Sequence, residues 1–165
     1  ISATYNRGTW GPRTHGVLKR MDHATIFIFI AGTYTPIALT VVGGTAGTVL
    51  LWIVWLAALA GVIFRVFWVG APRWLIVPVY ISMGWAAVFF IPEILSNGGT
   101  AIFLLIAVGG LCYSVGAVIY GLKRPDPSPK WFGFHEIFHS FTLGGYVSHY
   151  VGICLAIFGV GVIAH

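Results

Sequence analysis

Residues 134–149 read FHEIFHSFTLGGYVSH and open the last apolar segment of the chain. Three histidines and one glutamate lie among its aromatic and aliphatic residues. Ionisable side chains are costly inside hydrocarbon, so such a cluster in an apolar segment indicates a functional site. His135 and His139 are four residues apart. On a helix this spacing stacks both imidazoles on one face, where they can reach one metal ion.

The composition indicates an integral membrane protein with a single transmembrane domain over residues 1–165. The chain is 58% hydrophobic and only 8% charged, whereas a soluble domain carries about 25% charged residues. The nine basic residues, which give a net charge of +5, are scattered between apolar segments. We therefore expect membrane lipids as partners and no nucleic acid. Cys112 and Cys154 lie inside apolar segments, and no disulfide framework is predicted.

Five apolar segments are long enough to cross a bilayer, which requires about 20 helical residues. Glycine- and proline-rich breaks separate them. The predicted spans are 23–42, 47–68, 74–92, 100–120 and 135–163. The predicted fold class is therefore all-α, a multipass transmembrane helix bundle. Since the chain does not begin with methionine, we expect it to be the C-terminal part of a longer protein, beginning in the tail of a helix.

The positions of the basic residues predict the orientation of the bundle. They precede the first span or lie in the loops after the second and fourth spans, which places them all on one side: Arg7, Arg13, Lys19, Arg20, Arg65, Arg73, Lys123, Arg124 and Lys130. The positive-inside rule makes this side cytoplasmic. Trp68, Trp74 and Trp131 lie near the same boundary, as interfacial anchors do. We expect a protein of the inner (plasma) membrane with its N-terminal end cytoplasmic and its C-terminus outside.

Polar residues far apart in the sequence share one predicted depth. Asp22 begins the first span, and His135 and His139 begin the last span, on the same side. Ser2 and Asn6 end the truncated first helix at that level. The two are one helical turn apart, and the alternative is that both are ordinary boundary residues. The shared depth predicts a single site near the cytoplasmic face.

Each candidate residue also has a simpler interpretation. Asp22 is a preferred N-cap for a helix that starts beside it. The two histidines can bond to neighbouring backbone or lipid headgroups at a helix end. With Glu136 they match the HExxH pattern of zinc proteases, although no acidic residue follows as a third ligand, and Glu136 also suits the first turn of a helix. His149 lies ten residues beyond His139, about 15 Å deeper, so it is expected to bond a neighbouring helix instead of the same ion.

Several of these stretches resemble bacterial hemolysin III proteins, which belong to the superfamily of progestin and adiponectin receptors. The resemblance lies in SATYN at 2–6, LKRMDH at 18–23, AGTYTP at 31–36, MGW at 83–85 and the stretch 134–149. It implies seven transmembrane helices with a cytoplasmic N-terminus. Two helices would then precede this chain, and its five predicted spans would be helices three to seven.

The resemblance also implies a zinc site near the cytoplasmic face. His135 and His139 match two ligands on helix seven. Asp22 matches an aspartate that contacts the zinc-bound water, and direct binding of Asp22 to zinc is the alternative. Ser2 matches a supporting serine. The third histidine of the family aligns with Asn6, a departure that weakens the expected Zn²⁺ binding.

The implied function is that of a zinc-dependent hydrolase of membrane lipid amides or esters, with a role in membrane lipid homeostasis. Two alternatives stay open. One is a pore-forming or cytolytic membrane protein. The other is a sensor of membrane state with a degenerate metal site.

Overall fold

The computed structural model describes residues 4–5, 8–68, 70–129 and 131–159. These residues form helices and contain no β-strand, which confirms the all-α fold class. The elements are α2 (Pro12–Pro36), the π-helical turn η1 (Ile37–Val42), α3 (Gly44–Phe67), α4 (Arg73–Gly84), the 3₁₀ turn η2 (Ala86–Phe90), α5 (Ile91–Glu93), the π-helical turn η3 (Ile94–Gly98), α6 (Gly99–Leu122) and α7 (Phe134–Phe158).

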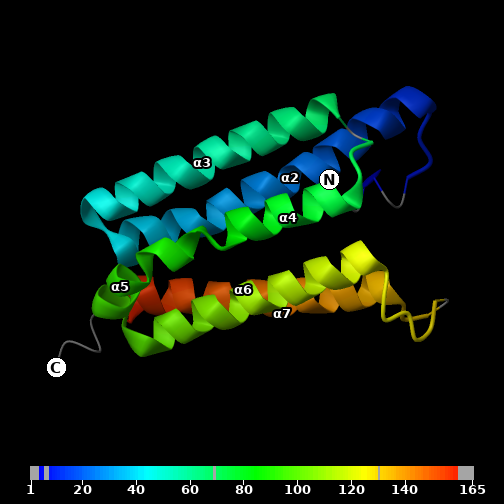
Figure 1. Cartoon of the computed structure of the whole chain (residues 1–165). Helices are drawn as coiled ribbons and strands as arrows, with labels where there is room; N and C mark the ends of the chain where they lie inside the picture. Colours follow the sequence, from blue (N-terminus) through cyan, green and yellow to red (C-terminus); the bar gives the residue numbers. More distant parts are fainter. Residues whose placement is uncertain (1–3, 6–7, 69, 130, 160–165) are drawn as a thin grey trace.

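Four helical stretches of the described chain are long and apolar enough to cross a membrane. They are Pro12–Val42, Gly44–Phe67, Trp74–Leu122 and Phe134–Phe158. The third contains 49 residues, which would measure about 74 Å if straight, more than twice the hydrocarbon thickness of a bilayer. It instead folds back on itself, so that α4 and α6 pack against each other in opposite directions (Figure 1).

The fold-back explains why four stretches are found where five separate spans are predicted. The break before the fourth predicted span is not an open loop, because η3 continues the helical hydrogen bonding up to Gly98. Gly99 then reverses the chain with a φ of 73°, a left-handed conformation that glycine adopts without strain. The two arms of the stretch occupy the predicted spans 74–92 and 100–120.

The helix start at Pro12 contradicts one interpretation of Asp22. Pro12 lies in the first turn of α2 and Gly11 precedes it, and proline is favoured at the first helical position because its φ is preset. Asp22 therefore lies more than two turns inside the helix, and the prediction that it caps the helix is wrong. The first span begins about three turns earlier than predicted at residue 23.

The helices form two packed pairs that α4 connects. α2 packs along α3 and α6 packs along α7, while α4 contacts α6 and, less extensively, α2 (Figure 1). We call the end where η1 and η3 meet the closed end, and the end where α2, α4 and α7 begin the open end. The buried core lies toward the closed end, and its members include Phe27, Ala31, Ala38, Leu50, Val54, Ala58, Ile94 and Ile102.

Specific polar contacts fasten the closed end. The Asn97 side-chain amide donates to the carbonyl oxygens of Val41 (3.0 Å) and Val42 (3.2 Å) and so ties η3 to η1. Gly47 lies so close to the Ala38 carbonyl oxygen that a Cβ would overlap with it. Close approach of this kind is the usual role of small residues between membrane helices.

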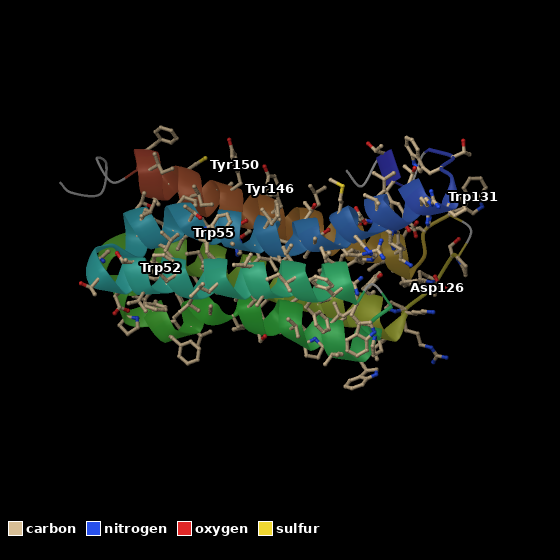
Figure 2. The ribbon with its side chains drawn as sticks, turned by 90° about the horizontal axis from the view of Figure 1, so that it is seen from above. Trp52, Trp55, Asp126, Trp131, Tyr146 and Tyr150 are labelled. Atoms are coloured by element: carbon tan, nitrogen blue, oxygen red, sulfur yellow. The ribbon has the colours of Figure 1, made fainter. Side chains whose placement is uncertain are left out.

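The open end contains the described basic residues. Lys19 lies in the first half of α2, Arg65 in the last turn of α3, and Lys123 directly after α6. Asp126 and Trp131 lie at the same end in Figure 2. The predicted grouping of the basic residues at one end therefore holds for the described ones, whereas Arg7 and Lys130 lie outside the described residues.

Apolar side chains cover much of the outer surface. On α3, Trp52, Leu56 and Leu59 are more than half exposed. Such a surface requires lipid around it, because soluble proteins expose only small apolar patches. The chain is an integral membrane protein.

Candidate functional site

A cavity of about 1210 Å³ extends from the open end between α2, α4, α6 and α7. Most of its wall is apolar. Its ionisable lining residues include Lys19, Asp22, His23, Arg65, His135, His139 and His149. The predicted residues Asp22, His135 and His139 are therefore brought to one cavity from opposite ends of the sequence.

The two histidines at the start of α7 are paired. Their Nε2 atoms are 3.1 Å apart, and the ring centroids are separated by 4.6 Å with the rings nearly perpendicular at 85°. The spacing of four residues has placed both rings on one face of the helix, as predicted. In a metal-free protein an Nε2–H of one ring donates to the Nε2 lone pair of the other.

Two carboxylates hold the start of α7 and so position this pair. The Gly133 N–H donates to Glu136 Oε2 (2.9 Å), and the Phe134 N–H donates to Asp126 Oδ1 (3.0 Å). Helix starts leave such N–H groups without intrahelical partners, and carboxylates there also complement the helix dipole. The contact of Glu136 supports its interpretation as a helix-start residue over a role as a protease base.

Asp22 approaches the pair from α2. It lines the same cavity, and its carboxylate is close enough to act electrostatically on the His139 imidazole. However, the described residues contain no group of three or more His, Cys, Asp or Glu side chains that could hold a metal ion. Ser2 and Asn6, the other predicted site residues, lie outside the described part of the chain.

The donor set fits part of a zinc site. Two nitrogens bound to one tetrahedral zinc at about 2.0–2.1 Å lie about 3.3–3.4 Å from each other. The observed separation between the Nε2 atoms of His135 and His139 is 3.1 Å, which is close to this value. Zinc also accepts carboxylate oxygen, which Asp22 carries. The histidine pair can therefore supply two ligands.

Sequence reasoning missed the role of Arg65 in this cavity. Arg65 was grouped with the interfacial basic residues, but only 3% of its surface is exposed and it lines the cavity. Its charge interacts with His23 and Tyr80. The available signal was a lone arginine followed by further apolar residues, which indicates a charge facing the bundle interior.

His149 lies deeper and is separate from the histidine pair. Its Nε2 is 3.1 Å from the Ile106 carbonyl oxygen, and its ring packs edge-on against Tyr113 with centroids 5.4 Å apart. This contact with α6 agrees with the expectation that His149 bonds a neighbouring helix. Tyr113 was assigned no particular site role from the sequence.

Comparisons with known proteins agree with the resemblance seen in the sequence. Residues 1–150 match the model of a family described as Haemolysin-III related. A "Hemolysin-3 homolog" of Bacillus subtilis (strain 168) is 37% identical over 145 residues, which cover 88% of this chain and 65% of the relative. "Hemolysin-3" of Bacillus cereus is 35% identical over 134 residues, which cover 81% of this chain and 58% of the relative. The chain thus spans about two thirds or less of these relatives. No solved structure matches it.

Proposed function

The chain belongs to the haemolysin-III related family of membrane proteins, and from this premise we propose that it is a metal-dependent hydrolase of amide or ester bonds in membrane lipids. The observation that carries the proposal is the pair His135/His139, with Nε2 atoms 3.1 Å apart, at the wall of a long apolar cavity. Zinc is the metal that this pair would hold, and Asp22 would contact it directly or through water. Ser2 supports the site in this proposal.

In this proposal some cavity residues bind the lipid and others transfer protons. A zinc ion, when bound, supplies Lewis acidity toward a carbonyl oxygen and a water molecule. Asp22 accepts the proton of the attacking water, since a carboxylate within reach of the water is a suitable general base. The positive charges of Lys19 and Arg65 favour a released fatty acid carboxylate, and the apolar wall holds its acyl chain. This activity would serve membrane lipid homeostasis.

The proposed setting is the plasma membrane, with the open end facing the cytoplasm. The described basic side chains near this end support the orientation through the positive-inside rule. Exposed tryptophans at the same end, Trp68, Trp74 and Trp131, suit the lipid–water boundary.

Metal analysis of the full-length protein tests the proposal. We expect about one zinc per chain in the purified protein and a clear loss in His139→Ala and His135→Ala. His15→Ala is the matched control, because His15 lies in α2 and is not among the residues that line the cavity. Metal content that is negligible in all variants, or equal in all of them, contradicts a zinc site at this pair. A lipid amide or ester must also be cleaved by the wild type and not by Asp22→Asn.

Asn6 provides a second test of the same site. Asn6→His restores the third histidine that the family resemblance implies, so the variant should bind zinc more tightly than the wild type if the site is used. If the wild type binds no zinc and Asn6→His does, the chain has a degenerate site and a role as a sensor of membrane state is favoured.

The names of the relatives favour a cytolytic function as the second candidate. A pore requires a polar path through the bundle, whereas the core of this chain is apolar toward the closed end. Conductance of planar bilayers containing the purified full-length protein would support the cytolytic function, and lipid hydrolysis without conductance would contradict it.

A further inference from the structure

An adjacent pair of buried polar atoms in the cavity has no hydrogen-bond partner among the described residues. They are Nδ1 of His149 on α7 and the hydroxyl oxygen of Tyr113 on α6. Both residues line the cavity, and their rings are in edge-to-face contact. Buried polar groups are nearly always paired, so two adjacent exceptions in one cavity call for an explanation.

Two other polar side chains of the cavity are hydrogen-bonded. The Trp85 indole N–H donates to Ser114 Oγ (2.8 Å). The Tyr80 hydroxyl donates to the His23 carbonyl oxygen (3.3 Å).

The hydrogen bond made by Nε2 of His149 determines whether Nδ1 of the same ring donates or accepts a proton. A carbonyl oxygen only accepts, so Nε2 carries the proton that is donated to Ile106. In the neutral ring Nδ1 is then an acceptor. The Tyr113 hydroxyl can donate a proton and accept one. A ligand hydroxyl can thus donate to His149 Nδ1 and accept from Tyr113 at the same time.

Two glycines leave space for these rings. A Cβ on Gly109 would overlap with the His149 ring, and a Cβ on Gly145 would press against the Tyr113 ring. Both helices thus carry glycine where the two polar side chains would otherwise be displaced, which keeps the rings at the cavity wall.

The depth of the pair indicates where along a lipid the hydroxyl must lie. His149 is ten residues from His139 on one helix, which corresponds to about 15 Å along the axis. Lys19 and Arg65 provide positive charge at the open end of the same cavity. A carboxylate at that end places the middle of an extended acyl chain beside Tyr113 and His149.

We propose that His149 and Tyr113 form a subsite that binds a hydroxyl group in the middle of a lipid acyl chain. This inference and the proposed hydrolase function both require that the cavity binds a lipid. The inference concerns binding alone and does not require that the lipid is cleaved. The ligand class is a long-chain acid, or an ester or amide of it, that carries a hydroxyl far from the carboxyl carbon.

Three fatty acids that differ only in this group provide the test. The probes are stearic acid, stearic acid hydroxylated in mid-chain, and α-hydroxystearic acid, whose hydroxyl is next to the carboxyl group. Their dissociation constants are measured on the full-length protein in detergent by displacement of a fluorescent fatty acid. Free fatty acids contain no amide or ester bond, so hydrolysis does not contribute to these measurements, and a failure of the proposed hydrolase would not affect the result.

We expect the mid-chain hydroxy acid to bind about tenfold more tightly than stearic acid, since two hydrogen bonds replace two unsatisfied groups. The α-hydroxy acid should bind like stearic acid. Tyr113→Phe and His149→Phe should each reduce the tenfold preference to less than about threefold. Tyr80→Phe is the matched control, because its hydroxyl is already bonded, and it should retain the preference.

Equal binding of stearic and mid-chain hydroxystearic acid to the wild type would overturn the proposal, as would a preference that survives both substitutions. Thermal unfolding in detergent shows whether each variant is folded. Tyr113→Phe keeps the ring and its packing, so it decides the question even if His149→Phe does not fold.

Discussion

The closed end of the bundle is packed with apolar side chains, whereas the open end surrounds a cavity lined by ionisable ones. At the closed end the buried side chains are mainly apolar, the helices are in contact, and the Asn97 amide is bonded to backbone. At the open end ionisable side chains surround a cavity, and α2 and α7 lie on opposite sides of it. The comparison teaches that stability and chemistry are separated along the length of the same helices. Substitutions should therefore destabilise the protein at one end and change its binding properties at the other.

The largest loss of stability is expected from Gly47→Ala at the closed end. The new methyl group would overlap with the Ala38 carbonyl oxygen, which belongs to backbone and cannot rotate away. We expect the free energy of unfolding to fall by about 3 kcal/mol. Gly32→Ala is the matched control, because its Cβ meets no atom within 4 Å, and it should be neutral or slightly stabilising. Unfolding in a denaturing detergent titration measures both, and equal stabilities would refute the close contact.

A somewhat smaller loss is expected from Asn97→Asp. The carboxylate cannot donate, so it faces the carbonyl oxygens of Val41 and Val42 without a bond. The expected cost is about 2–3 kcal/mol in the same titration. Ser96→Ala should change the stability by less than about 0.5 kcal/mol, since the Ser96 hydroxyl is exposed and its contacts, with the Glu93 carbonyl oxygen and Asn97 Oδ1, both lie within its own turn. A neutral Asn97→Asp would mean that η1 and η3 are not tied by this side chain.

Tyr34→Phe tests the link between the two ends. The Tyr34 hydroxyl donates to the Gly84 carbonyl oxygen and accepts from the Ala87 N–H (3.1 Å), where α4 gives way to η2. Its loss leaves the buried Ala87 N–H without that acceptor, which should cost about 1–2 kcal/mol. Tyr150→Phe, on the outer surface of α7 (Figure 2) and 56% exposed, should have no measurable effect on thermal unfolding. A similar effect of both substitutions would contradict the prediction.

The smallest and most local effect is expected from Asp126→Ala at the open end. It removes the acceptor of the Phe134 N–H, which should cost about 1 kcal/mol. Hydrogen exchange should become faster in the first turn of α7 and stay unchanged in η1. Asp126→Asn keeps an acceptor oxygen and should restore most of the protection. Faster exchange throughout the bundle would show that the two ends are not independent.

Much of the fold was predictable because hydropathy and charge act over whole segments. The spans 47–68 and 100–120 agree closely with α3 and α6, since glycines stand where both helices begin and the basic residue Lys123 directly follows the end of α6. The start of α2 was missed because residues 12–22 are polar enough to resemble a loop, while Pro12 and the helical backbone bonds extend the helix through them. The fold-back near Gly98 was only partly foreseen, because π-helical turns keep the backbone bonded without any distinct sequence signal.

Some features of the candidate site were likewise predictable from the sequence, and others were not. The pairing of His135 and His139 follows from helical spacing alone and needed no tertiary information. The approach of Asp22 from α2 depended on two helices reaching the same depth, which charge patterns predict only coarsely. The burial of Arg65 and the contact between Tyr113 and His149 depend on how helix faces are rotated against each other. Because each helix is almost uniformly hydrophobic around its circumference, the sequence does not indicate which face of a helix contacts its neighbour.

The position of the contact between α7 and η1 has a mechanical consequence. α7 packs against η1 at the closed end, whereas its other end borders the cavity. α7 has 25 residues and is therefore about 37 Å long. A tilt of about 5° about its contact with η1 moves the end that carries His135 by about 3 Å. Such a displacement is comparable with the reach of a metal–ligand bond. Since α6 packs along α7, the two helices tilt together, and such a tilt moves His135 and His139 nearer to Asp22 or away from it.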